Sequence, residues 1–175
     1  FSIVGNAEVP AQIKITAGAD VKEVALKGTD GSPVWSPVKW TIWSSADGTT
    51  YTPITEAGED GDKITADGSL EKALALASKQ GGTIAASTTE TKKYFKLSWS
   101  WAFDGATADS TNGNRYDTLL GYAAAGDKTY TDATVSTAEG GAITVVDRSG
   151  ETDVTYTADT TISFSLTITV EQVQK

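Results

Sequence analysis

A strict alternation of apolar and hydroxyl side chains constrains this chain most. Over residues 161–170 (TISFSLTITV) every second residue is apolar, and each residue between them is Ser or Thr. Successive side chains of a β-strand point to opposite faces of a sheet, so the pattern predicts a long strand with one apolar and one hydrated face. The residues on the apolar face are Ile162, Phe164, Leu166, Ile168 and Val170.

Other segments repeat this two-residue period. Residues 93–103 and 9–16 alternate clearly, and residues 22–27, 38–43, 50–54, 130–135, 142–146 and 154–157 do so more weakly. The apolar faces of the two clear segments carry Phe95, Leu97, Trp99, Trp101 and Phe103 in one, and Val9, Ala11, Ile13 and Ile15 in the other. The 27 threonines also favour strands. Turn pairs such as Asp47-Gly48 separate the segments, so the sequence predicts an all-β, jelly-roll-like β-sandwich.

One segment has helical composition. Residues 69–79 (SLEKALALASK) are rich in strong helix formers, Asp67 or Ser69 is suited to cap the start, and Gly81-Gly82 is suited to end it. We predict one short helix in a connection between strands. Residues 104–114 are rich in Asp, Ser, Thr, Asn and Gly, which predicts an exposed loop.

The missing residue types exclude several classes of protein. The chain has no His and no Cys, so it has no Ser-His-Asp or Cys-His catalytic unit, no ordinary zinc, haem or iron–sulfur site and no disulfide. The net charge of −9 disfavours binding to nucleic acid. The sequence contains no run of about 18 apolar residues, so we predict no membrane-spanning helix. We therefore expect no enzymatic activity and no cofactor.

Three weaker hypotheses concern sites. Oxygen-rich segments hold the calcium candidates Asp60, Asp62, Asp104 and Asp109, but their spacing misses the helix-loop-helix calcium pattern and favours solvated turns. Paired carboxylates are the groups that a glycoside hydrolase needs, yet nothing in the sequence selects a pair. A monomeric carbohydrate- or surface-binding module using Trp35, Trp40 or Trp43 is the alternative that we keep, with Trp99 and Trp101 expected in the core.

The first residues raise the question of assembly. Phe1-Ser2-Ile3-Val4 is apolar and, as an exposed strand, is an aggregation hazard. Such a strand either pairs within its own sheet or is given to a neighbouring molecule, which produces head-to-tail polymers. Physical reasoning alone favours pairing within the chain. The first residue is Phe rather than Met, which we interpret as a processed or trimmed chain.

Several segments together resemble the secreted fibre-forming proteins related to TasA and camelysin, a class that includes archaeal bundling pilins. The resemblance rests on residues 96–104 (KLSWSWAFD), 116–121 (YDTLLG) and 162–172 (ISFSLTITVEQ), with Phe as first residue. It implies a secreted protein, extracellular or at the cell surface, that forms a filament or pilus of the biofilm-matrix kind. Camelysin-like proteins have been described as metalloproteases, but this chain lacks His altogether, so proteolysis is not carried over.

The resemblance also implies a mode of assembly. The chain is expected to form a homopolymer by donor-strand complementation, in which a donor segment over residues 1–8 completes a single β-sandwich domain over residues 9–175 of the next subunit. Lateral bundling of filaments is a further expectation. The donor face is predicted to carry Phe1, Ile3, Val4, Val9, Ile13 and Ile15. The predicted acceptor groove is formed by the apolar faces of residues 95–103 and 162–170.

Overall fold

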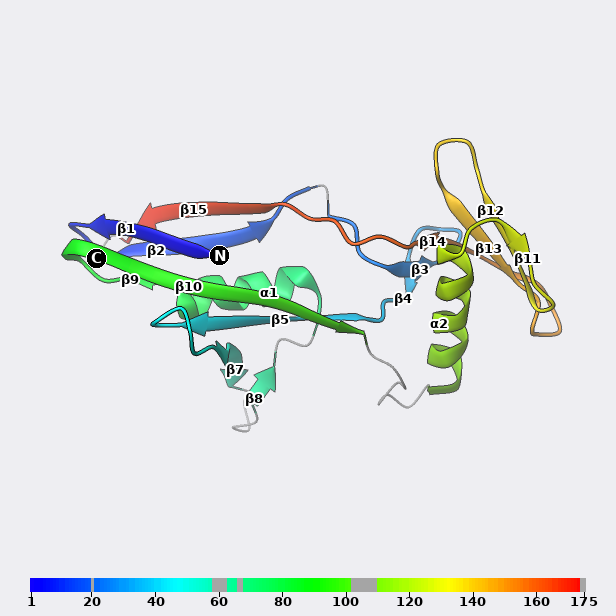
Figure 1. The fold of residues 1–175 in the computed structure, drawn as a ribbon, viewed down its shortest axis with the longest axis horizontal. Helices are drawn as coiled ribbons and strands as arrows, with labels where there is room; N and C mark the ends of the chain where they lie inside the picture. Colours follow the sequence, from blue (N-terminus) through cyan, green and yellow to red (C-terminus); the bar gives the residue numbers. More distant parts are fainter. Residues whose placement is uncertain (20, 58–62, 66–67, 102–109, 174–175) are drawn as a thin grey trace. The chain divides into compact units, whose positions relative to one another are not determined.

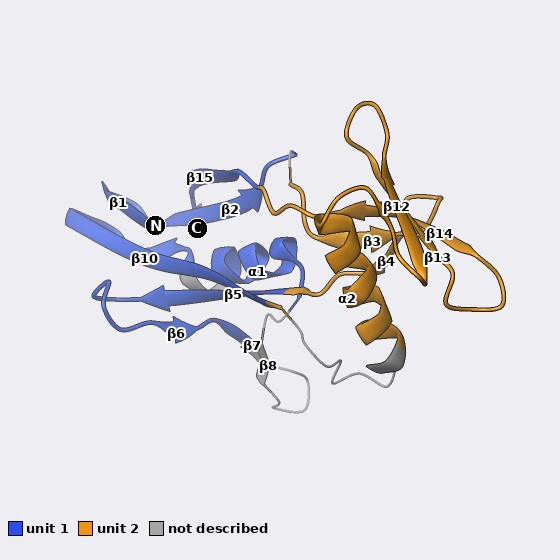
Figure 2. Cartoon of the chain, turned by 45° about the vertical axis from the view of Figure 1, so that its right-hand side comes forward, with its two compact units in different colours: residues 1–20, 39–100, 164–175 blue, residues 21–38, 101–163 orange. Residues whose placement is uncertain are grey.

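The computed structural model describes residues 1–19, 21–57, 63–65, 68–101 and 110–173 (Figure 1). Its strands form several antiparallel sheets, which confirms the predicted all-β, sandwich-like fold. The chain falls into two compact units (Figure 2), where the sequence indicates a single domain. Unit 1 holds residues 1–20, 39–100 and 164–175, and unit 2 holds residues 21–38 and 101–163.

The first sheet of unit 1 has the strand order β1-β10-β5-β6. Its strands are β1 (Ser2–Ala7), β10 (Ser87–Trp101), β5 (Val38–Ser45) and β6 (Thr52–Pro53). The observed β10 begins six residues before the predicted strand, and Phe103 lies outside the described residues. On β5 the alternation buries Val38, Trp40 and Ile42, as a sheet with one apolar face requires.

The second sheet of unit 1 has the order β15-β2-β9. Its strands are β15 (Leu166–Gln172), β2 (Ala11–Ala17) and β9 (Thr83–Ile84), and a separate hairpin joins β7 (Thr55–Ala57) to β8 (Lys63–Thr65). The C-terminal strand is shorter than its alternation predicts. Residues 161–165 lie outside it and contribute the isolated bridge between Lys22 and Ser163 and a hydrogen bond from the Gly18 N–H to the Ser165 carbonyl.

The predicted helix in unit 1 is confirmed. It is α1 (Leu70–Leu76), which continues as the π-helical turn η1 (Ala77–Gly81). The Ser69 side chain caps its start by accepting a hydrogen bond from the Lys72 N–H at 3.3 Å. The helix packs beside β2 and buries Leu70, Leu74 and Leu76 together with Ile13 and Ile15 of that strand. These side chains form the core of unit 1.

Unit 2 holds one six-stranded sheet with the order β11-β12-β13-β14-β3-β4. The strands are β11 (Lys128–Thr129), β12 (Ala133–Thr137), β13 (Ile143–Asp147), β14 (Val154–Asp159), β3 (Ala25–Lys27) and β4 (Pro33–Trp35). Their buried side chains, which include Leu26, Val135, Val145 and Tyr156, form the core of this unit.

A second helix, α2 (Ser110–Ala124), packs against this sheet. The loop predicted over residues 104–114 is wrong for residues 110–114, which form the start of α2. The helix is held by a buried stripe of Leu119, Leu120 and Ala123, whose packing outweighs the weak helix propensity of the preceding Asn and Gly residues. Within the described part of the chain, neither helix is long and apolar enough to cross a bilayer.

Candidate assembly edges

The strand β1 lies at the edge of its sheet, paired with β10 of the same chain. The pairing is antiparallel, with Ile3 opposite Lys93. The Phe1 and Phe95 main chains exchange hydrogen bonds of 2.9 and 3.0 Å, and their rings stack with centroids 5.5 Å apart. Ile3 is half-buried, whereas Val4 points outward and is exposed. The predicted donor segment therefore occupies an edge position within its own sheet.

The three other predicted donor residues lie elsewhere. Ile13 and Ile15 are fully buried on β2, between β15 and α1, and Val9 lies exposed in the turn between β1 and β2. Because β2 is the central strand of its sheet, these isoleucines belong to the core of unit 1. A donor segment that is given to a neighbouring molecule must therefore end before β2.

The pairing of β1 covers only part of β10. Main-chain groups alternate between the two edges of a strand, so Leu97 and Trp99 present theirs on the same edge as Phe95. Among the described residues, no strand pairs with these two positions on that edge. Phe95 is 1% exposed, whereas Trp99 is 54% exposed. The expectation that Trp99 is a core residue is therefore wrong, because its stretch of β10 runs beyond the strand that covers Phe95.

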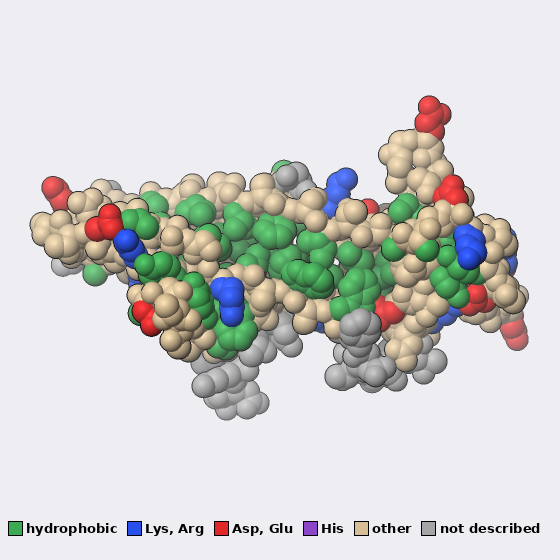
Figure 3. Space-filling view, in the orientation of Figure 1, with side chains coloured by type: hydrophobic (Ala, Val, Ile, Leu, Met, Phe, Trp, Pro, Cys, Tyr) green, Lys and Arg blue, Asp and Glu red, His purple; other side chains and the backbone are tan. Residues whose placement is uncertain are grey.

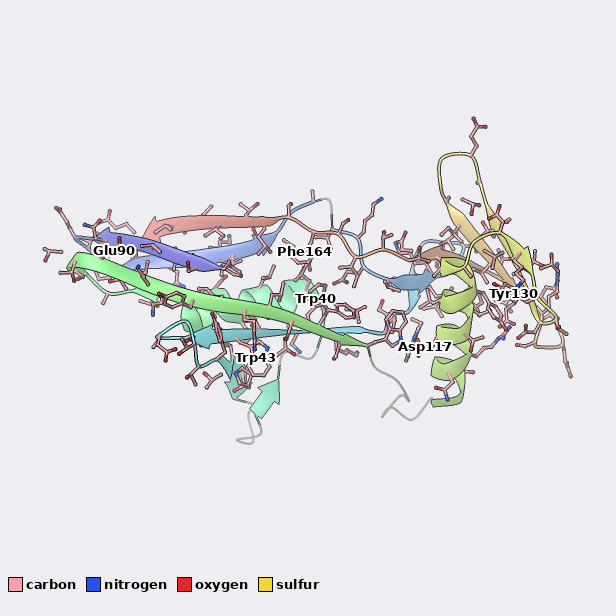
Figure 4. The ribbon with its side chains drawn as sticks, viewed as in Figure 1. Trp40, Trp43, Glu90, Asp117, Tyr130 and Phe164 are labelled. Carbon is pink, nitrogen blue, oxygen red and sulfur yellow. The ribbon has the colours of Figure 1, made fainter. Side chains whose placement is uncertain are left out.

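The strand β15 is the second open edge. Its partners on β2 are buried, yet Ile168 and Val170 are 41% and 56% exposed although they lie opposite Ile15 and Ile13. Before β15, Phe164 is exposed on one side and packs its ring edge-on against buried Trp40, with centroids 5.3 Å apart (Figure 4). Leu166 and Ile162 are half-buried. The alternating segment thus forms the rim of the core instead of its centre.

These edges border one apolar face. Figure 3 shows hydrophobic side chains exposed on unit 1 between β15 and β10. The exposed large residues of these segments include Phe1, Trp99, Phe164, Ile168 and Val170. An exposed apolar surface beside unpaired strand edges is typical of a site that another strand covers.

The opposite edge of β2 is closed by the helix. A groove of about 550 Å³ lies there, lined by residues 12–17 of β2 and by Glu71, Ala75, Ser78 and Lys79. The Ser78 hydroxyl accepts a hydrogen bond from the Ile15 N–H at 2.8 Å, and the Ile13 N–H donates to the Gly82 carbonyl at 2.7 Å. Because both main-chain donors are satisfied, this edge of β2 is a poor acceptor for a further strand.

In unit 2 two tryptophans share one carboxylate. The indole N–H groups of Trp35 and Trp101 donate to Oδ1 of Asp117 at 2.8 and 3.2 Å. Asp117 lies on α2, and Trp35 lies on β4, so the carboxylate ties the helix to the edge of the sheet. Both indole donors are satisfied by the protein itself, which gives this cluster a structural role.

A partly buried ion cluster also joins α2 to the sheet. Arg115 donates to both carboxylate oxygens of Asp147 and, through Nη2, to the Asp132 carbonyl at 3.0 Å. Its Nη1 donates to the Asp132 carboxylate. Burial alone raises the pKa of Asp147, but the hydrogen bonds from Arg115 and Ser149 outweigh it and hold that pKa below its ordinary value. This cluster is not among the sites predicted from the sequence.

The tryptophans of the sugar-binding hypothesis are placed as follows. Trp40 is buried in the core of unit 1, so it is not a stacking surface for a sugar. Trp35 is half-buried and bonded to Asp117. Trp43 donates to the Ser98 hydroxyl at 2.8 Å, and the Lys96 ammonium lies 4.3 Å from the centroid of its ring. The Lys96 ammonium thus covers one face of the Trp43 ring, and the indole N–H groups of Trp35 and Trp43 are both paired within the protein.

The calcium candidates Asp60, Asp62, Asp104 and Asp109 lie outside the described residues. Within the described ranges, no group of three or more Asp and Glu residues is arranged to hold a metal ion.

No protein-family model, no curated protein and no solved structure matches the chain.

Proposed function

We propose that this chain is a structural subunit of an extracellular filament, and that it polymerises head to tail by exchange of β1. In the polymer, β1 of one subunit pairs with β10 of the next. The observation that carries the proposal is the position of β1, an edge strand that covers only part of β10 and lies beside an exposed apolar face. The extracellular location rests on the resemblance stated above.

The interactions of β1 favour exchange because a second copy offers the same ones. Its pairing with β10, the stacking of Phe1 on Phe95 and the inward position of Ile3 are equally satisfied by a strand from a neighbouring subunit. Domain swapping of this kind costs little, since each interaction that β1 makes within its own chain forms again between chains. Only residues 8–10 connect β1 to β2. A connection this short favours domain swapping, because in the exchanged form it straightens and carries β1 away to the neighbouring subunit.

The strength of the joint follows from the same interactions. A fully buried Phe or Ile side chain contributes about 1.5–3 kcal/mol, and Phe1 and Ile3 contribute less than this because Phe1 is exposed and Ile3 half-buried on β10; the ladder hydrogen bonds add to their contribution. Association costs several kcal/mol, so a single joint of this size is weak. The open positions Leu97 and Trp99 increase the surface available to a donated strand that slides further along β10.

The test separates the donor from the acceptor. A chain lacking residues 1–8 is mixed with a synthetic peptide of residues 1–8, and thermal unfolding is measured with and without it. The peptide is expected to bind and raise the melting temperature. A peptide with Ile3→Asp should fail, because Ile3 faces inward, whereas one with the matched change Val4→Asp should bind, because Val4 faces outward.

Electron microscopy supplies the second readout. The full chain should form filaments and the chain lacking residues 1–8 should not. The proposal fails if the truncated chain forms the same filaments, or if the peptide gives no stabilisation while the truncated chain remains folded by circular dichroism.

A further inference from the structure

The outer edge of β15 is open along the whole strand. Residues 167, 169 and 171 of β15 lie opposite Thr16, Lys14 and Gln12 of β2, and the alternation of the ladder turns their main-chain groups toward β2. The Ile13 and Ile15 donors point the other way, toward Gly82 and Ser78. The alternate residues of β15, which are Leu166, Ile168 and Val170, therefore point their N–H and C=O groups away from β2. Among the described residues, no strand pairs with them.

Apart from the Leu97–Trp99 stretch of β10, the other edge strands named below have a protection that this edge lacks. Natural sheets protect their edges with short strands, Pro, Lys or bulges. Strand β6 ends in Pro53, β4 begins with Pro33, β11 begins with Lys128, β9 has two residues, and β1 has a register shift between Gly5 and Ala7. By contrast β15 has seven residues, a continuous register with β2 and no Pro or Lys.

We propose that two copies of this chain associate through β15, which pairs antiparallel with β15 of the second copy about a twofold axis. The register that pairs the whole strand joins Leu166 to Gln172 and Ile168 to Val170, and it places Thr169 on the axis. The two three-stranded sheets then form one continuous sheet, with about eight new main-chain hydrogen bonds.

The side chains of β15 suit this arrangement. A twofold axis perpendicular to the sheet keeps the two apolar faces on the same side, so Ile168 of one copy lies beside Val170 of the other. The strand carries one charged side chain, Glu171, which lies opposite Thr167 of the second copy. The two glutamates are thus kept apart, and no like charges face each other across the joint although each chain carries a net charge of −9.

The inference does not depend on the exchange of β1, because β15 and β1 are different edges in different sheets. Exchange of β1 gives a head-to-tail chain of subunits, whereas pairing of β15 is closed and joins two copies side by side. If both occur, β15 is the lateral contact between filaments.

The absence of cysteine makes a direct test simple. In the variant Thr169→Cys, two cysteines meet at a non-hydrogen-bonded pair with Cα atoms about 4.5 Å apart, which suits a disulfide. Mild oxidation of the native protein should give at least a tenfold larger share of disulfide-linked dimer than the control Thr155→Cys, an exposed position on the interior strand β14.

A second variant tests the edge without a disulfide. Ile168→Lys places a charge on the open edge, as natural edge strands do, and Ile168 is exposed enough for the fold to tolerate it. Light scattering of the β1-truncated chain separates this dimer from β1 exchange, and the Lys variant should be monomeric at concentrations where its parent is dimeric. A parent that stays monomeric, equal cross-linking at residues 169 and 155, or a dimer unaffected by the Lys change overturns the inference. Preferential cross-linking of Thr167→Cys overturns the proposed register.

Discussion

At the scale of single residues, Gly82 has the least room for a side chain among the glycines that the structure describes. A Cβ atom there lies 2.5 Å from the Ile13 carbonyl oxygen and 2.6 Å from the Ser78 carbonyl oxygen. Both neighbours are main-chain atoms, so the β2 edge or the π-helical turn must move. We expect Gly82→Ala to lower the free energy of unfolding by about 1–3 kcal/mol, measured by denaturant titration.

The matched control is Gly121→Ala, on the exposed side of α2, where an added Cβ meets nothing within 4 Å. This change should stabilise the protein by about 0.5–1 kcal/mol, because alanine favours the helix. Equal effects from the two substitutions would contradict the close approach of β2 and the turn at Gly82.

The Arg115–Asp147 pair gives a second residue-scale prediction. Asp147→Ala leaves the Arg115 guanidinium without its main partner, and we expect a loss of about 3 kcal/mol in unfolding free energy. The exposed pair between Arg148 and Asp153 is the control, where Asp153→Ala should cost at most about 1 kcal/mol. Equal losses of unfolding free energy in the two variants would show that the Arg115–Asp147 pair stabilises the fold no more than an exposed ion pair does.

The Asp147 carboxylate should also make the stability of the folded protein depend on pH. Since the pKa of Asp147 is lower in the folded protein than in the unfolded chain, its contribution is present above the unfolded value of about 3.9 and is lost as pH falls toward the folded value. The wild type should therefore lose stability more steeply than Asp147→Asn between about pH 5 and pH 3. Parallel stability curves for the two proteins would refute this role.

At the scale of elements, the shared carboxylate of Asp117 joins α2 to β4. Asp117→Ala removes the acceptor of two indole N–H groups, and we expect a loss of about 2 kcal/mol together with a change in tryptophan fluorescence. Asp117→Asn keeps a carbonyl acceptor and should recover part of the loss. As a control, Asp127→Ala removes an exposed carboxylate that accepts a hydrogen bond from the Thr137 hydroxyl, and it should leave both measurements nearly unchanged.

The elements also show what the sequence could predict. Alternation located β2, β5 and β10, since a two-residue period survives in any sheet with one buried face. It did not reveal that β15 is an open edge, because alternation specifies the two faces of a strand and not its neighbours. The helix α2 begins with polar residues, but Tyr116, Leu119, Leu120 and Ala123 have helical spacing, which is a signal for this helix in the sequence itself.

The partly buried cluster around Arg115 was harder to foresee. Asp147 follows Val145 at the two-residue spacing of a buried strand face, which is a hint that its carboxylate points inward and needs a partner. The partner Arg115 lies 32 residues away on the helix that the sequence analysis missed. Without α2, no pattern joins the two.

At the scale of the whole molecule, the division into two units is invisible in the sequence. The chain enters unit 2 at residues 21–38, returns to unit 1, and enters unit 2 again at residues 101–163. Each unit is therefore built from separate segments, and no linker with a shift in composition marks a boundary. The domain boundary predicted after residue 8 does not describe this arrangement. The arrangement depends on contacts between segments that are distant in the sequence, and local sequence patterns do not report such contacts.

Net charge governs how whole molecules meet. Each chain carries a net charge of −9 and has a pI near 4.4, so copies repel one another at neutral pH. The two assembly edges are formed by main-chain groups and apolar side chains, which salt screens little, whereas the repulsion is screened over about 8 Å at physiological ionic strength. Association measured by light scattering should therefore increase as NaCl rises from about 0.02 to 0.5 M, and as pH falls from about 5.5 to 4.5, where the carboxylates begin to take up protons; above that range the chain, which has no His, keeps nearly constant charge. The Ile168→Lys variant of the β1-truncated chain should stay monomeric throughout the same series, which separates screening from nonspecific salting out. Association that weakens with added salt would mean that ion pairs between copies hold the assembly, and neither proposed edge would then account for it.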